Sequence, residues 1–565
     1  MFNTKSTNKM SFFAFIFLVL FFSTTQTDVR LYTFLVLPLL VIIIRFMNDE
    51  RIDTFFKKNN INLIIQKISE VNDKHFFLFL LFILTILNMI FQGQYLNFET
   101  IDSDIHTYLI VGNDVLNGSL PYENQWDDKG PIFYIFYAFL ILLSNKNLMI
   151  FKILCDLILI FISFMISKII STQDISNFKI NSFVGSSLFL LLLSTPWGSN
   201  EYSELFCLFF IAPSIYLLLK KSDSKRNIFL SGLLFGLSTL TNQGSGLFIF
   251  VIFVILFQKY KLKIATHFFS GVLIPHIVIF TLYALRGLLD IYFSTLFIIP
   301  LKYSQQSFNF INELLVYFKE TFMYNSLLYL FIIFLITLAI YKFILKEITS
   351  SSYFVYVGLS ISLLFFYLGS TGYKHHLIFF LFFLCLFIPF LNNLKTFHWL
   401  FLSLIVSSLV VVGSGALKQS YDNFISLDDI YKEYPLKNLA LNIESRFEND
   451  FTIFSLDHNL VLFYLNKRNE SFIIHPTNYS EPAIVNELIK INRIKTDELP
   501  YRISQKPNIV LCSQQIRWLL TDVNCEVTDF YTGYERVDTN LYFNNPKRSL
   551  YNDSYRSIDL YINNN

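Results

Sequence analysis

Residues 102–131 read Asp102-Ser-Asp104-Ile-His106-Thr-Tyr108-Leu-Ile-Val-Gly112-Asn-Asp114-Val-Leu-Asn-Gly118-Ser-Leu-Pro121-Tyr122-Glu-Asn-Gln-Trp126-Asp127-Asp128-Lys129-Gly130-Pro131. This is the densest polar stretch in the first half of a very apolar chain, and acids, a histidine, a lysine and aromatic residues lie between turn-forming glycines and prolines. A plain connecting loop would need only turn residues and solubility. The concentration of side chains that bind ions or transfer protons instead predicts a functional loop at a membrane surface.

The rest of the chain has the composition of a membrane protein. Of its 565 residues, 54% are hydrophobic, 15% are charged and 66 are phenylalanine. A soluble domain cannot bury that much apolar surface. The net charge of +2 is too small to indicate a nucleic-acid partner. The sequence therefore predicts an α-helical polytopic membrane protein whose surroundings are membrane lipids.

Repeated apolar runs of about 15–22 residues mark the predicted membrane spans, of which there are about thirteen. The pair at 228–240 and 246–258 is short and could be tilted or re-entrant. The predicted spans are 10–26, 31–47, 76–92, 148–168, 182–196, 203–219, 228–240, 246–258, 265–285, 326–345, 353–370, 376–391 and 397–414.

The orientation follows from the positions of lysine and arginine. Loops 48–75, 220–227 and 259–263 are basic, which places them in the cytoplasm. Residues 93–147 then face the extracytoplasmic side. The apolar run 131–145 is too short to cross easily, so we expect it to lie as a helix in the outer interface. Three further polar stretches share that face, namely 197–204, 286–325 and 370–376.

Three regions are expected. Residues 1–75 form a two-helix membrane anchor followed by a cytoplasmic loop, and residues 76–415 form the transmembrane catalytic domain. Residues 416–565 are more polar and form a small extracytoplasmic α/β domain, in which Cys512 and Cys525 could pair. Its expected strands are 452–456, 471–474 and 508–511, and its expected helices are 458–466 and 481–493.

Asp102, Asp104 and Lys129 are the main candidates in the outer loop. A partly desolvated carboxylate at a membrane face can take a proton from an incoming hydroxyl, although most loop acids are simply solvated. His106 alone is better explained as a hydrogen-bonding loop residue. Lys129 could neutralise a phosphate at headgroup depth, or it could anchor the following helix or pair with a neighbouring acid.

Two more polar groups stand at the outer ends of spans. Asn200, Glu201 and Glu204 could bind a metal with Asp104 or orient an acceptor, while a helix start would explain one acid alone. Glu201 is nearer the outer surface, so we expect it to matter more than Glu204. His375 and His376 would point about 100° apart on an α-helix, so one of them meeting a phosphate or sugar is more plausible than joint metal binding.

These residues resemble the GT-C glycosyltransferases, which are integral membrane enzymes that use polyprenyl-phosphate-linked sugars. The resemblance is strongest to the bacterial branch related to protein O-mannosyltransferases and lipid A aminoarabinose transferases. The matching positions are Asp104, Gly112, Gly118, Pro121-Tyr122, Asp127-Asp128-Lys129-Gly130-Pro131, Glu201, Gly232, Gly236, Asn242-Gln243 and His375-His376.

The resemblance implies a role for each matched residue. Asp104 would be the general base or a residue close to a metal, and Lys129 would meet the lipid phosphate. Glu201 would be the second acidic motif, so a divalent metal could be held by Asp104 and Glu201. The chain departs from many relatives in having Asp102-Ser-Asp104-Ile where they have Asp-Glu, and Asn242 where they have lysine.

The implied activity is that of a hexosyl- or pentosyltransferase. It would move sugar from a polyprenyl-phosphate donor to a lipid, glycan or protein acceptor, in a bacterial inner (plasma) membrane with the active site facing out. The sequence contains no nucleotide-binding loop, which agrees with a lipid-linked donor. The alternatives are a lipid-linked glycan flippase or other transporter, which would carry charges in mid-span, and an oligosaccharide polymerase.

Overall fold

A computed structural model describes most of the chain from residue 70 onward. Three predicted spans, 10–26, 31–47 and 397–414, lie outside the described residues, as do Asn200 and Cys525. The described residues are 70–173, 178–198, 201–220, 224–260, 262–304, 309–324, 326–344, 350–369, 373–391, 415–447, 450–512, 533–544 and 555–563.

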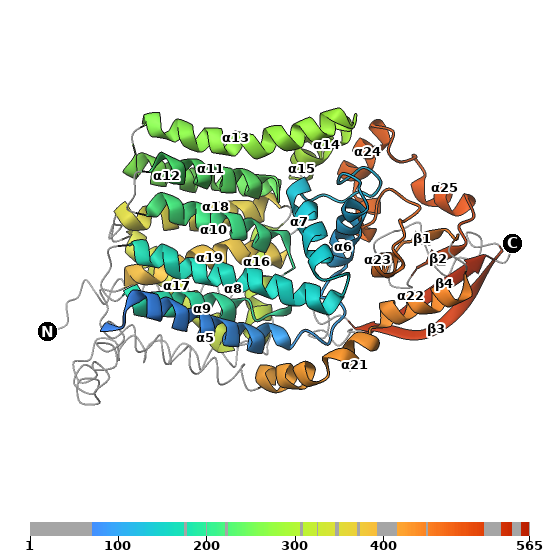
Figure 1. Cartoon of the computed structure of the whole chain (residues 1–565), viewed down its shortest axis with the longest axis horizontal. Coiled ribbons are helices and arrows are strands. Elements are labelled where there is room, and N and C mark those ends of the chain that lie inside the picture. Colours follow the sequence, from blue (N-terminus) through green and yellow to red (C-terminus); the bar gives the residue numbers. More distant parts are fainter. Residues whose placement is uncertain are drawn as a thin grey trace.

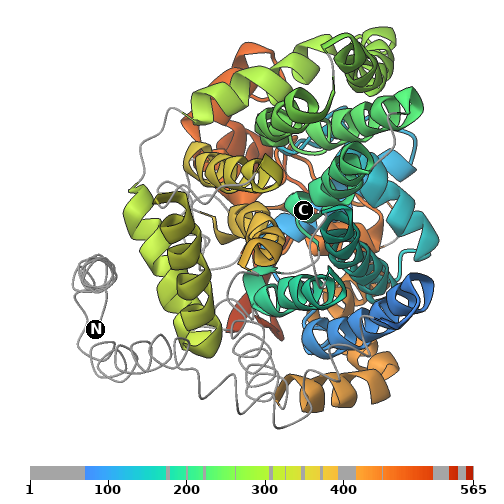
Figure 2. The same ribbon diagram turned by 90° about the vertical axis from the view of Figure 1, so that its left-hand side faces the viewer.

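Long apolar helices run side by side through the larger part of the molecule, with α13 at one edge and α5 at the opposite edge (Figure 1 and Figure 2). Within the described residues, α5, α8 and the 265–285 part of α13 are long and apolar enough to cross a membrane, and several shorter helices are apolar. The total of about thirteen spans stays a prediction. These helices are α5 (Asp73–Gly93), α8 (Leu148–Thr172), α9 (Phe178–Leu192), α10 (Ser203–Leu219), α11 (Lys225–Thr239), α12 (Ile249–Lys259), α13 (Leu262–Leu285), α17 (Ser326–Ile344), α18 (Ser350–Leu368) and α19 (Ile378–Phe387).

Two helices, α6 (Ser103–Leu116) and α7 (Pro131–Leu143), lie across one end of these long helices (Figure 1). The helix expected at 131–145 is α7, which begins with proline at its first turn, where the missing N–H costs nothing. The polar stretch between α6 and α7 is therefore held at one end of the bundle. The expected loop 286–325 contains α14 (Leu289–Phe293), α15 (Ile299–Tyr303) and α16 (Phe310–Tyr324).

Glycines explain how closely α11 packs against α13. A side chain at Gly232 would place its Cβ 2.0 Å from the carbonyl oxygen of Phe268, and one at Gly236 would place it 2.6 Å from that of Val272. Any larger residue would therefore push the two helices apart, which is why small residues suit such a contact between membrane helices.

The C-terminal part contains a four-stranded sheet and several helices. The sheet order is β1-β2-β4-β3, in which β1 and β2 are parallel and the other pairs are antiparallel. Residues 471–474 were expected to be a strand, but they form no strand. Ile473 makes an isolated bridge with Trp126 instead. The elements are α21 (Leu427–Lys432), α22 (Pro435–Arg446), β1 (Ile453–Ser455), α23 (Leu460–Leu465), α24 (Pro482–Lys490), α25 (Glu498–Ser504), β2 (Ile509–Leu511), β3 (Tyr534–Asn544) and β4 (Tyr555–Asn563).

The C-terminal part packs on the end of the bundle that carries α6. The guanidinium of Arg468 lies 2.6 Å from the carboxylate of Asp114 on α6. The Trp126 backbone N–H donates to the carbonyl of Phe472 at 2.7 Å. Residues of α6, of the loop before α7 and of the C-terminal part are therefore in direct contact.

Candidate active site at one end of the bundle

Asp102 caps the start of α6. Its Oδ1 accepts from the Ser103 backbone N–H at 2.7 Å, and its Oδ2 accepts from the Tyr202 hydroxyl at 2.9 Å. Both oxygens are therefore occupied in holding the helix start and the loop before α10. A carboxylate at this position is also stabilised by the helix dipole.

Asp104 lies in the first turn of α6 and is bound less completely. Its Oδ1 lies 2.9 Å from Nε2 of His475, a residue of the C-terminal part. Its Oδ2 accepts from the Tyr108 hydroxyl at 3.5 Å, which is the limit of a hydrogen bond. This side chain is 22% exposed, so an incoming group can reach the carboxylate. Of the two candidate acids, Asp104 is thus the better placed for chemistry.

His475 is a residue that the sequence did not single out. Its Nδ1 lies 2.6 Å from the Thr477 hydroxyl and its Nε2 lies near Asp104, so both ring nitrogens are engaged. Burial opposes protonation of this ring, but the hydrogen bond and the charge of Asp104 outweigh burial and raise the pKa of His475 to about 9. At neutral pH an imidazolium therefore holds Oδ1 of Asp104.

We expect the stability of the protein to depend on pH through this pair. Because the folded-state pKa is raised from 6.5 to about 9, the stabilisation is fully present below pH 6.5 and is lost as the pH rises through about 9. The unfolding temperature in detergent should fall over this window in the wild type, and His475→Asn should lack that fall. The exposed His75, changed to asparagine, is the control. An unchanged slope in the His475 variant would contradict the assignment.

Lys129 lies in the loop between α6 and α7. Its Nζ is 3.0 Å from Oδ1 of Asp128, and its side chain is 14% exposed. Burial opposes its charge, but Asp128 and then Asp127 hold its pKa above the usual range. Gln243 also holds this loop, because its side-chain amide donates to the Asp128 carbonyl at 3.0 Å. Lys129 is thus a preorganised cation surrounded by carboxylates.

Asp127 is held inside the protein by a tyrosine. Its Oδ2 accepts from the Tyr134 hydroxyl at 2.6 Å, and the residue is buried. Burial, followed by the charge of Asp128, raises its pKa. Asp127 therefore supports the loop and α7.

Glu204 and the histidine pair lie close together, near Lys129. Glu204 is fully buried in the first turn of α10, and its Oε1 lies 3.7 Å from Nε2 of His376. His375 stacks on Tyr202, with ring centroids 4.3 Å apart and planes inclined by 12°. Because Tyr202 also donates to Asp102, the histidine pair and α6 are linked through a single side chain. Both Glu204 and Asp104 are near enough to Lys129 to favour its charged form and so to raise its pKa.

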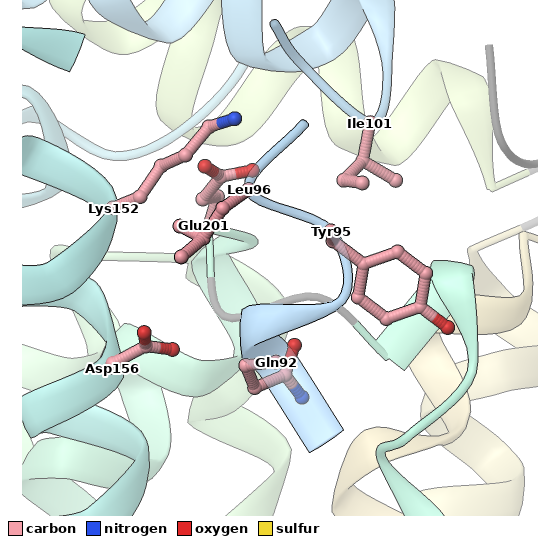
Figure 3. A pocket seen from close by; sticks show the side chains of 7 residues that line it. All are labelled: Gln92, Tyr95, Leu96, Ile101, Lys152, Asp156 and Glu201. Carbon is pink, nitrogen blue, oxygen red and sulfur yellow. The ribbon is translucent and has the colours of Figure 1, made fainter. Parts of the chain in front are cut away.

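Glu201 lies in a different place. Together with Lys152 and Asp156 it lines a small pocket beside the end of α5, where its carboxylate faces Lys152 (Figure 3). Its Oε2 is buried and has no hydrogen-bond partner among the described residues. Burial raises its pKa, which Lys152 lowers in part. The structure therefore brings Asp104, Lys129, Glu204, His375 and His376 to one end and sets Glu201 apart in this pocket.

This separation predicts which glutamate matters for activity. Glu204→Gln should lower turnover by about 10²-fold, because Glu204 is buried against His376 within the candidate site. Glu201→Gln should cost less than about tenfold, because it acts on the neighbouring pocket. Turnover of both purified variants, at equal thermal stability, is the measurement. A larger loss in the Glu201 variant would restore the order expected from the sequence.

Two solved structures of one membrane enzyme resemble this chain. ArnT from Cupriavidus metallidurans in the apo state superposes with a TM-score of 0.51 at 10% identity, over 76% of this chain and 92% of that chain. The same protein bound to undecaprenyl phosphate superposes with a TM-score of 0.52 at 8% identity, over 86% of this chain and 98% of that chain. An oligosaccharyltransferase from Archaeoglobus fulgidus, tethered with an acceptor peptide, superposes with a TM-score of 0.40 at 11% identity, over 83% of this chain and 74% of that chain. This TM-score is too low to support a common fold. No protein-family model and no curated protein matches the chain. The similarity to the two ArnT structures shows that this chain has the fold of ArnT.

Proposed function

We propose that this protein is a membrane glycosyltransferase that moves a hexose or pentose from a polyprenyl-phosphate donor to a hydroxyl of a lipid, glycan or protein acceptor. The observation that carries the proposal is the presence of Asp104, whose side chain is partly exposed, and of the preorganised cation Lys129 at the same end of an apolar helix bundle. The ArnT structure with undecaprenyl phosphate supports a lipid phosphate as the group that such a site accepts.

The reaction that fits this geometry is a displacement at the anomeric carbon of the donor. The acceptor oxygen forms a bond to that carbon while the bond from the carbon to the phosphate oxygen breaks. Oδ2 of Asp104 takes the acceptor proton, and His475 holds Oδ1 so that the free oxygen keeps its direction. The polyprenyl phosphate leaves with the bonding electrons, and Lys129 stabilises its charge.

The location of the donor explains why the site lies at the end of the bundle. A polyprenyl chain dissolves in the bilayer and presents its phosphate at headgroup depth. The loop between α6 and α7, which carries Lys129, lies at the end of the helix bundle and would meet a phosphate at that depth. We place this end on the outer face of a bacterial inner membrane, because the basic loops 48–75, 220–227 and 259–263 favour the cytoplasm.

A transfer assay with the purified full-length protein tests the proposal. A panel of polyprenyl-phosphate-linked hexoses and pentoses is incubated with glycan, lipid and peptide acceptors, and both the free polyprenyl phosphate and the product are measured by mass spectrometry. Surface glycans of cells with and without the protein are compared in parallel. Unchanged glycans together with no consumption of any donor would overturn the proposal.

In the same cells, a thiol at Asn540 should react with a membrane-impermeant maleimide if this end faces outward.

A further inference from the structure

Three aromatic rings form a stack beside the start of α6, and the reaction described above does not use its outermost member. The ring of His375 is nearly parallel to that of Tyr202 and to that of Tyr373, with planes inclined by 12° in both pairs. The ring centroids are 4.3 Å apart in the first pair and 5.5 Å apart in the second. Parallel rings at such distances attract one another, so these three side chains support one another as one aromatic stack.

Exposure increases along the aromatic stack. Tyr202 is fully buried, His375 is 3% exposed and Tyr373 is 45% exposed. The buried end is fixed, because the Tyr202 hydroxyl donates to Oδ2 of Asp102 at 2.9 Å. The aromatic stack therefore ends in a ring, that of Tyr373, which the protein supports but does not cover.

The backbone that carries Tyr373 is also held in place. Its carbonyl accepts from the His376 backbone N–H at 3.1 Å, within the turn Lys374–Leu377 that precedes α19. The next residue, Lys374, forms an ion pair with Glu320 on α16. A tyrosine side chain has only two rotatable bonds, so a ring placed in this way offers a rigid contact surface at a small entropic cost.

Tyr373 lies near both groups that the proposed reaction uses. Partial burial, followed by the charges of Tyr303 and Asp104, raises the pKa of the Tyr373 hydroxyl, while Lys129 lowers it in part. Asp104 and Lys129 are therefore both close enough to this residue to affect its ionisation. In the proposed displacement, the transferred sugar lies between the base and the cation that receives the phosphate. A ring near both groups thus stands beside the space that this sugar must occupy.

A sugar ring has a surface that matches the face of an aromatic ring. The C–H bonds on one face of a sugar are apolar and carry a small positive charge, whereas the face of an aromatic ring is negative. Stacking the two surfaces buries apolar area and leaves the sugar hydroxyls, which point outward from the ring, free to meet polar groups. Binding sites commonly combine aromatic side chains with a few such polar groups.

We propose that the exposed face of Tyr373 stacks against the transferred sugar of the donor and so orients its anomeric carbon between Asp104 and Lys129. The ligand is a hexose or pentose with one face of C–H bonds, and a bulky substituent on that face would prevent binding. The contact is made by the aromatic ring rather than by the hydroxyl. This inference rests on the proposed function, because it takes the sugar of the lipid donor as the ligand.

Substitutions that separate the ring from the hydroxyl test the contact. Tyr373→Phe keeps the ring and should bind a polyprenyl-phosphate sugar as the wild type does, whereas Tyr373→Leu should weaken this binding by about tenfold. Polyprenyl phosphate without a sugar should bind equally to all three proteins. The control is Tyr353→Leu, which removes a tyrosine that is 47% exposed near the other end of α18. Equilibrium binding to the full-length protein in lipid discs is the measurement.

Three results would overturn the contact. Equal losses in the phenylalanine and leucine variants would assign the binding to the Tyr373 hydroxyl. A matching loss for polyprenyl phosphate without a sugar would assign the residue to the phosphate or to folding. Unchanged binding of the sugar donor in the leucine variant would leave the ring without a role.

A second measurement separates this contact from the proposed function. Methyl glycosides of the same hexoses and pentoses are observed by saturation-transfer NMR, which reports sugar protons close to the protein without any lipid donor or transfer. A signal that disappears in Tyr373→Leu, together with no consumption of any donor by the wild type, would uphold the sugar contact and reject the glycosyltransferase. Normal sugar transfer by Tyr373→Leu would reject the contact and leave the glycosyltransferase standing.

Discussion

Asp104→Asn should lower sugar transfer by about 10²–10⁴-fold, the usual cost of losing a general base. The amide has nearly the same shape, and its oxygen can still accept from His475, so the start of α6 should persist. What it loses is the ability to take the acceptor proton at Oδ2. Donor binding should remain, because Lys129 and its loop are untouched. Transfer and donor affinity measured on the same purified sample separate these two effects.

Asp102→Asn is the matched control for this substitution. Asn is as good a helix cap as Asp, so the contact to the Ser103 N–H should survive and the loss of activity should be smaller. Full activity in the Asp104 variant with loss in the Asp102 variant would exchange the two roles. Full activity in both would remove the start of α6 from the chemistry and with it the displacement described above.

Lys129→Ala should weaken binding of the polyprenyl-phosphate sugar by about 10- to 100-fold, the cost of losing a hydrogen bond to a charged group. Lys129→Arg should retain part of the affinity, because the charge survives with a different geometry. Equilibrium binding of the donor to protein in detergent or lipid discs is the measurement.

Asp128→Asn provides the control for Lys129. If Lys129 binds the phosphate, removing the charge of Asp128 should leave donor affinity equal or higher, because the lysine loses a competing partner. If Lys129 only anchors the loop through Asp128, both variants should lower the unfolding temperature alike and leave the donor affinity unchanged. That second pattern would reject the phosphate role.

The helical part of the fold could be predicted well because apolar runs report burial directly. The run 203–219 matches α10, and the run 265–285 lies within α13. The C-terminal strands were harder to predict. Residues 471–474 have the composition of a strand, but the Phe472 carbonyl is taken by the Trp126 backbone, a partner hundreds of positions earlier. The strands β3 and β4 were not predicted.

The candidate site could be predicted in part. The sequence placed the loops that carry Lys129, Asp104 and the histidine pair on one face, and the structure brings these residues to one end of the bundle. The choice between Glu201 and Glu204 depended on where α10 begins, and it begins at Ser203, so Glu201 falls before the helix. The local sequence pattern does not determine the residue at which a helix begins. His475 could not be found either, because its role depends on how the C-terminal part docks on α6.

The contact between His475 and Asp104 also has a consequence for the timing of biosynthesis. Asp104, Lys129 and Glu204 emerge from the ribosome long before His475, which comes after residue 415 and must cross the membrane if the proposed orientation holds. A partly synthesised chain can therefore insert its helices before His475 is present to hold Asp104. Transfer would begin only when synthesis, export and folding of the last segment are finished, so that an incomplete protein would be inactive.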